Sequence, residues 1–129
     1  MLDTDTCSYI LKNHPVHLRK IFNSHYHNNI VCISSVTYAE LLTGAMRSGS
    51  IRLQERIADF TSLLEVTDWT VSCAKQYAVL QTALLNAGTP IGNMDAMIAA
   101  AALAIDATLV TNNEKHFARI GGLKITNWL

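Results

Sequence analysis

Four side chains that could bind a metal ion follow predicted strands or lie early in predicted helices. They are three carboxylates and one amide, at Asp3, Glu40, Asp95 and Asn113. Strand ends and helix starts meet at one edge of a parallel sheet, so we expect the four side chains to converge there. Carboxylates packed that closely repel one another, and a divalent cation would remove the repulsion.

The chemistry that such a site predicts is phosphodiester hydrolysis. One or two carboxylates plus several waters satisfy Mg²⁺ or Mn²⁺, and the remaining positions can take phosphate oxygens and an activated water. Structural roles stay open for three of the four residues, because Asp3 and Asp95 could cap helices and Asn113 could belong to a turn. Glu40 is harder to explain in that way, since "VTYAELLTGAM" around it is otherwise free of charge.

The elements that would position these residues are short apolar strands alternating with helices. We expect strands at residues 1–2, 30–33, 65–67, 108–110 and 124–126. We expect helices at residues 6–13, 16–23, 36–44, 53–64, 70–87, 94–107 and 114–120. This alternation predicts an α/β fold in a single domain over residues 1–129, with a central, mostly parallel sheet of four to five strands and helices on both faces.

Composition excludes several classes of protein. Ten basic and ten acidic residues cancel, so no global field attracts a polyanion, which must be held by a local patch or a metal ion. No apolar run reaches the roughly 20 residues that cross a bilayer, and no signal-peptide pattern opens the chain, so we expect a cytoplasmic protein. The widely spaced cysteines predict neither a disulfide framework nor a zinc site; they are Cys7, Cys32 and Cys73.

Four segments occur in a characteristic order: "MLDTDTCSYIL", "ISSVTYAELLTGA", "GTPIGNMDAMIAAAALA" and "LVTNNEKHF". Together they resemble the PIN-domain ribonucleases, and most closely the VapC toxins of bacterial toxin–antitoxin pairs. The resemblance covers nearly the whole chain, and the joint order and spacing make it specific. It implies a PIN-like three-layer sandwich and a metal-dependent endoribonuclease that cleaves structured RNA such as tRNA. It also implies a homodimer that a cognate VapB-like antitoxin neutralises.

The resemblance assigns the family's three acids to Asp3, Glu40 and Asp95, and its fourth polar position to Asn113. By this assignment they surround Mg²⁺ or Mn²⁺. We expect Asp3 and Asp95 to bind the ion, Glu40 to complete the shell or orient the attacking water, and Asn113 to hold an outer water. Further candidates for substrate or outer-shell contacts, with one or the other threonine donating to phosphate, are Thr4, Asp5, Thr111 and Asn112.

Three features depart from the family pattern. Only two residues precede Asp3, so we expect a truncated start or an unusually short first strand. Asp5 stands where the family usually has asparagine, which adds charge beside the metal. Asn113 replaces a carboxylate, which predicts one firm metal site rather than two.

Two other functions remain open. "DTD" also resembles the motif of HAD-type phosphatases, with Asp3 as nucleophile and Asp5 as acid and base. Alternatively, the acids only cap helices in a non-catalytic interaction module. For RNA, the local basic candidates are mostly expected to be solvated; they are Arg47, Arg52, Arg56, Lys115, His116 and Arg119. We also expect His25 and His27 to be solvated in a polar loop.

Overall fold

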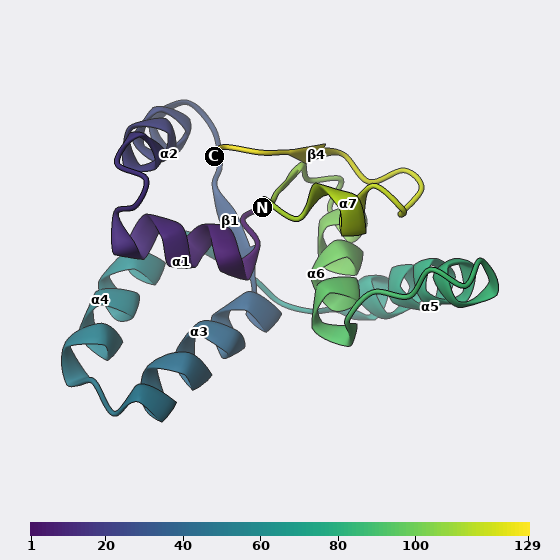
Figure 1. Cartoon of the computed structure of the whole chain (residues 1–129), viewed down its shortest axis with the longest axis horizontal. Helices are drawn as coiled ribbons and strands as arrows, with labels where there is room; N and C mark the ends of the chain where they lie inside the picture. Colours follow the sequence, from purple (N-terminus) through teal and green to yellow (C-terminus); the bar gives the residue numbers. More distant parts are fainter.

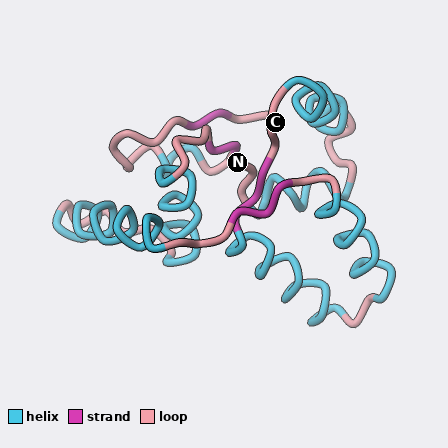
Figure 2. Tube along the Cα trace, turned by 180° about the vertical axis from the view of Figure 1, so that it is seen from behind, coloured by secondary structure: helices cyan, strands magenta, loops and turns pink.

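The computed structural model describes residues 1–129 and contains helices and short strands in alternation. The strands run through the middle, between two groups of helices (Figures 1 and 2). None of the helices is long and apolar enough to span a bilayer. The elements are α1 (Thr4–Lys12), α2 (His17–Asn28), β1 (Cys32–Ser34), α3 (Ser35–Ser48), α4 (Ile51–Ser62), β2 (Glu65–Thr67), α5 (Val71–Asn86), α6 (Asn93–Ala104), β3 (Leu109–Val110), α7 (Glu114–Phe117) and β4 (Ile125–Thr126).

The strands form two parallel pairs, β1 with β2 and β3 with β4. The first residues of the chain join the pairs: Leu2 N–H donates to the Cys32 carbonyl (2.9 Å), and Asp3 N–H donates to the Val110 carbonyl (3.0 Å). Leu2 also forms a parallel bridge with Val110. The expected single sheet of four to five strands is therefore not confirmed as one continuous ladder. Strands of two or three residues make too few bonds for that.

Helices cover both faces of this strand layer, because neighbouring strand residues belong to different apolar clusters. Leu109 packs in the cluster that contains residues of α5, α6 and α7, whereas Val110 packs in the cluster with residues of α1, α2 and α4. Cys32 and Ile33 divide between the clusters in the same way. Successive side chains of a strand point to opposite faces, so the clusters lie on opposite sides. The α/β fold with helices on both faces is confirmed.

Side-chain caps begin helices α3 and α5. Ser34 Oγ accepts a hydrogen bond from Thr37 N–H (3.1 Å) and caps α3, which carries Glu40. Thr70 Oγ1 accepts from Cys73 N–H (3.4 Å) and caps α5. A side-chain cap satisfies one of the N–H groups that a helix start leaves unpaired.

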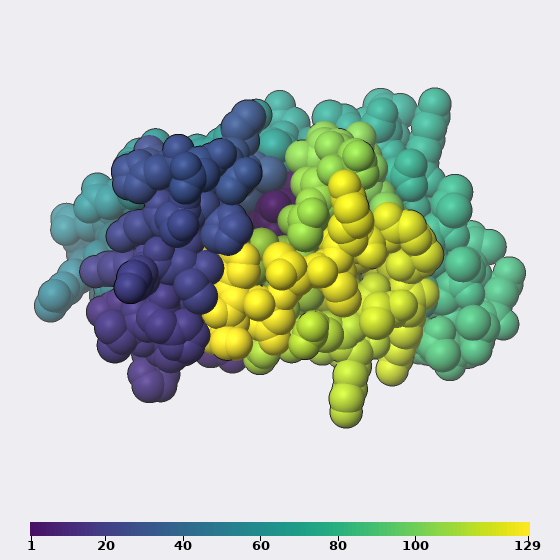
Figure 3. All heavy atoms as spheres, turned by 90° about the horizontal axis from the view of Figure 1, so that it is seen from above, coloured from purple at the N-terminus to yellow at the C-terminus, as the bar shows by residue number.

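Helix α2 differs most from the sequence prediction. It continues to Asn28, so the histidines expected in a loop lie on its last turns. The ring of His25 stacks on Trp128, with centroids 4.6 Å apart, and the C-terminal segment lies against the N-terminal third (Figure 3). The contact between His25 and Trp128 stabilises the end of α2. The local sequence alone does not favour a helix there. Val16, expected to begin this helix, precedes it and is 72% exposed.

Helix α3 also runs past its predicted end. It passes through Gly44 and stops at Gly49, whose φ of 67° suits glycine. A glycine inside a helix costs about 1 kcal/mol relative to alanine. Burial of Leu41 and Ala45 on the same helix offsets that cost.

Candidate active site

Asp3 lies where the N-terminal segment leaves the strand layer. Its side chain is 5% exposed and its Oδ1 accepts a hydrogen bond from Thr6 N–H (2.8 Å), so it caps α1 as one sequence interpretation proposed. Burial raises the pKa of Asp3, and hydrogen bonds from Thr111 and Thr6 offset part of that rise. The cap occupies one acceptor site of the Asp3 carboxylate. An ionised carboxylate has about four such sites, so others remain available.

Glu40 lies in the second turn of α3 and is partly buried. Its Oε1 accepts a hydrogen bond from Thr4 Oγ1 (2.7 Å), and Thr4 Oγ1 is also 3.3 Å from Thr37 Oγ1. A hydroxyl has one proton, and the shorter contact, to the carboxylate, takes it. Glu40 takes part in no salt bridge. Its charge is therefore held in place by a hydroxyl and not neutralised by a base.

Asp95 lies in the first turn of α6, whose N-cap is Gly92 without a side-chain cap bond. The capping interpretation of Asp95 is therefore wrong. Burial raises the pKa of Asp95 most, the negative charges of Asp3, Glu40 and Asp5 raise it further, and His116 lowers it. Asp95 therefore lies within reach of the negative charges of three other carboxylates, two of which belong to the predicted site.

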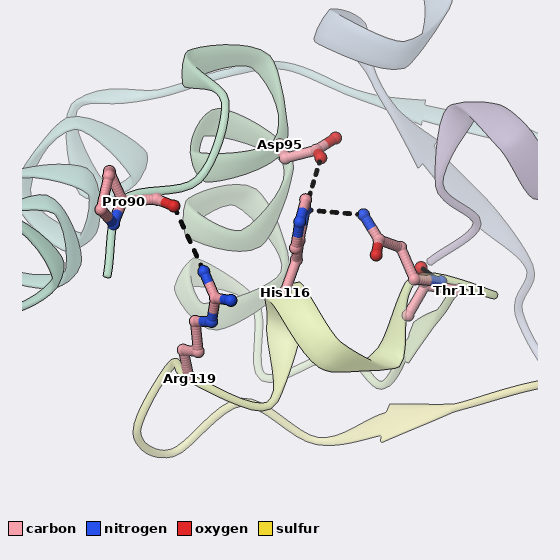
Figure 4. Close-up of polar contacts among 6 residues, drawn as sticks. Pro90, Asp95, Thr111, His116 and Arg119 are labelled. Carbon is pink, nitrogen blue, oxygen red and sulfur yellow. Dashed lines mark hydrogen bonds and ion pairs between the residues drawn. The ribbon is translucent and has the colours of Figure 1, made fainter. Parts of the chain in front are cut away.

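The fourth motif reaches this edge through a turn. Asn113 N–H donates to Thr111 Oγ1 (2.9 Å), and Asn113 Nδ2 lies 2.8 Å from His116 Nδ1. The same Nδ1 is 4.0 Å from Asp95 Oδ2, and Figure 4 shows the His116 imidazole directed toward the Asp95 carboxylate. The sequence had placed His116 only among possible RNA contacts. The signal for a site residue was its spacing of three residues from Asn113, which puts both on one face of a helical turn.

The donor atoms at this edge fit a hard divalent cation. They are mostly carboxylate and amide oxygens, which Mg²⁺ and Mn²⁺ prefer, and the carboxylates destabilise one another when the cation is absent. No three His, Cys, Asp or Glu side chains are arranged so that they could hold an ion between them. The arrangement suits an ion held by one or two carboxylates with waters in the other positions.

The remaining predicted contacts divide into three groups. Thr111 is fully buried and its Oγ1 accepts a hydrogen bond from Asn113 N–H, which leaves Thr4 as the partly exposed one of the two threonines. Asn112 faces the C-terminal segment, where its Oδ1 accepts from Asn127 Nδ2 (3.2 Å). Asp5 is exposed in the first turn of α1 and adds negative charge near Asp95.

The predicted site acids do not line every cavity of the protein. A cavity of about 560 Å³ lies beside the residues that precede β1 and β3, and none of the four predicted acid and amide residues lines it. A smaller groove of about 230 Å³ runs between α1, α3 and α4, and Thr4 and Glu40 line it. The carboxylates define the site, because an ion and a phosphate can bind at an open edge and need no enclosed cavity.

Two of the basic candidates hold neighbouring backbone. The Arg56 guanidinium donates to the Leu11 carbonyl, and Arg119 Nη1 donates to the Pro90 carbonyl (3.3 Å), which ties the loop before α6 to the segment after α7 (Figure 4). The other predicted basic side chains outside the His116 contact are exposed, at Arg47, Arg52 and Lys115.

Comparison with known proteins gives consistent matches over the whole chain. The model of the PIN domain family matches residues 1–123. The "tRNA(fMet)-specific endonuclease VapC" of Salmonella typhimurium is 39% identical over 99% of this chain and 96% of the relative. The "Ribonuclease VapC2" of Rickettsia felis is 40% identical over the same shares of the two chains. A crystal structure of VapBC2 from Rickettsia felis, bound to a promoter DNA fragment, superposes with a TM-score of 0.92 at 39% identity, over 100% of this chain and 98% of that chain.

Proposed function

The chain belongs to the PIN-domain family, and from this premise we propose that it is the endoribonuclease toxin of a toxin–antitoxin pair. We propose structured RNA such as tRNA as its substrate and Mg²⁺ or Mn²⁺ as its cofactor. The observation that carries the proposal is the shared environment of Asp3, Glu40 and Asp95, in which each acid comes from a different helix start or turn. The ribonuclease names of relatives at 39 and 40% identity support the same reaction.

Each residue has a role that follows from its place. A bound divalent ion would lower the pKa of water and neutralise charge on the phosphate. Asp3 and Asp95 would hold that ion, since both are carboxylates at the edge of the strand layer. Glu40, fixed by the Thr4 hydroxyl at 2.7 Å, would accept a hydrogen bond from the attacking water and orient it. Asn113 would hold an outer water.

A protein partner is the second part of the proposal. Solved relatives of high similarity are VapBC structures from Rickettsia felis and Salmonella typhimurium. We propose that a VapB-like antitoxin neutralises this chain by laying a segment over the acids, and the groove beside Thr4 and Glu40 offers adjacent space for it. We further propose that the active toxin is a homodimer in the cytoplasm.

The test is cleavage of transcribed tRNAs, including initiator tRNA, by the purified chain with Mg²⁺, Mn²⁺ or EDTA. We expect cleavage with either metal and none in EDTA. Asp3→Asn and Asp95→Asn should abolish cleavage. Asp106→Asn is the matched control, because this exposed acid pairs with Lys124 Nζ at 3.1 Å and is none of the four predicted site residues. Cleavage in EDTA, or full activity in either site variant, would refute the assignment.

The alternatives have weaker support. A phosphatase with Asp3 as nucleophile is disfavoured by the PIN family match over residues 1–123. It would also leave Glu40 and Asp95 without a role. A beryllofluoride adduct on Asp3 would revive it. A non-catalytic interaction module would bind no Mn²⁺ in calorimetric titration near neutral pH.

A further inference from the structure

The Asn113 side chain stands at the start of helix α7 but does not cap it. Asn113 is the N-cap residue of α7, and no side-chain cap hydrogen bond forms there. An asparagine at this position ordinarily accepts a hydrogen bond through Oδ1 from a backbone N–H of the first turn. Here the amide nitrogen is directed instead at the third residue of the helix, with Nδ2 2.8 Å from His116 Nδ1. The helix therefore forgoes a common stabilising contact, and Asn113 Oδ1 accepts no hydrogen bond from the protein.

The contact with His116 fixes the orientation of the amide. The amide nitrogen can only donate, so Nδ1 accepts with its single lone pair and the neutral ring carries its proton on Nε2. Asp95 Oδ2 is 4.0 Å from the same Nδ1, beyond hydrogen-bond distance, so this acid does not compete for the ring. A carboxylate presents two like oxygens, whereas the two ends of an amide differ, and half a turn of the side chain would exchange an acceptor for two donors. The hydrogen bond from Asn113 to His116 therefore decides which end of the amide stays free.

The backbone of Asn113 is fixed separately. Its N–H donates to Thr111 Oγ1 at 2.9 Å, and Thr111 is fully buried. The Thr111 hydroxyl donates in turn to the Asp3 carboxylate. Asn113 is thus tied to Asp3 through its backbone and to α7 through its amide nitrogen, which leaves Oδ1 as the one polar atom of its side chain without a partner in the protein.

We propose that His116 is a positioning residue, which holds the nitrogen end of the Asn113 amide and so leaves Oδ1 free to accept a hydrogen bond. This rests on the proposed function, in which Asn113 holds an outer water. A water can donate to a carbonyl oxygen, and a water whose lone pair is engaged elsewhere can do nothing else, so only the oxygen end of the amide suits it. Without His116, the Asn113 side chain is free to rotate and to use Oδ1 to cap α7.

Nuclear magnetic resonance on the metal-free, ¹⁵N-labelled full chain tests the hydrogen bond itself. At about pH 8, where histidine is ordinarily neutral, the wild type should show an unprotonated His116 Nδ1 and scalar coupling between Asn113 Nδ2 and that atom. His17→Leu is the matched control, because it removes an exposed histidine at the start of α2; it should keep the coupling. A proton on Nδ1, or no coupling in the wild type, would overturn the proposal whatever the protein does to RNA.

Cleavage of tRNA tests what the hydrogen bond does. In His116→Leu, which lacks the acceptor, kcat should fall at least about tenfold with KM changed less than about twofold, as for one hydrogen bond lost in the transition state. His116→Gln supplies a carbonyl acceptor and should recover kcat to within about threefold of the wild type. In an Asn113→Ala background, His116→Leu should change kcat by less than about twofold, because the side chain that His116 holds is gone. The free energy of unfolding should not fall in His116→Leu, since Asn113 is then free to cap α7.

The outcomes separate this inference from the proposed function. Undiminished kcat in a folded His116→Leu, or an equal loss with and without the Asn113 side chain, would overturn the role of His116 and leave the nuclease standing. A wild type that cleaves no tRNA with Mg²⁺ or Mn²⁺ would overturn the proposed function, and with it the positioning role, even where the coupling is present. Circular dichroism checks that each variant folds, which the 42% exposure of the His116 side chain leads us to expect.

Discussion

Thr4→Val isolates the contact that fixes Glu40. Valine keeps the branched shape of threonine but removes the hydroxyl that donates to Glu40 Oε1 at 2.7 Å. Hydrogen bonds to charged groups contribute about 1.5 to 3 kcal/mol. Both side chains are only partly buried, which favours the lower end of that range. Since about 1.4 kcal/mol is a factor of ten in rate, we expect RNA cleavage to slow about tenfold.

The assay is single-turnover cleavage of tRNA at saturating metal, with urea unfolding measured in parallel. Water can replace the lost donor at Glu40, so the free energy of unfolding should fall by less than about 1 kcal/mol. Ser8→Ala is the matched control: its Oγ donates only to the Thr4 carbonyl (3.1 Å), and its removal should leave the rate unchanged. A Thr4→Val rate within twofold of the wild type would refute the positioning of Glu40 by Thr4.

Two further predictions concern stability. Because burial and neighbouring carboxylates raise the pKa of Asp95 and burial raises that of Asp3, the metal-free protein is favoured while these groups are protonated. That contribution is fully present below the unfolded value of 3.8 and is lost as pH rises through the raised folded pKa. Asp95→Asn should therefore flatten the loss of stability as pH rises above 3.8 in urea titrations; an unchanged slope would contradict this sign. Leu2→Ala should cost about 2 to 5 kcal/mol of unfolding free energy, since Leu2 is fully buried between the two strand pairs. Ile30→Ala, at a residue 81% exposed, should change it by less than about 0.5 kcal/mol, and equal losses in the two variants would show that the bridge at Leu2 does not hold the layer together.

Much of the fold could be predicted from local patterns. The runs around Ile33 and Val110 are short and apolar, as strands covered on both faces are, and Ser34 and Thr70 are caps with an evident mechanism. The end of α2 could not be predicted, because "SHYHNN" has no apolar periodicity and is held by the stacking of His25 on Trp128. Contacts between distant segments leave no local signal.

The candidate site was likewise predictable only where local sequence patterns determine it. Asp3, Glu40 and Asp95 could be brought together from the sequence, because strand ends and helix starts meet at one edge of a parallel layer. The contact of His116 with Asp95 depends on how α7 packs beside α6, which spacing along the chain does not encode. The burial of Thr111 also became evident only in the packed structure.

The most direct measurement of the central claim is calorimetric titration of the EDTA-treated protein with Mn²⁺ at pH 7.5, alongside Asp3→Asn and Glu40→Gln. The account predicts one binding site per chain in the wild type and at least about tenfold weaker binding in Asp3→Asn, because a carboxylate that relieves the mutual repulsion of the cluster is lost. Undetectable binding in the wild type, or an unchanged affinity in both variants, would contradict it.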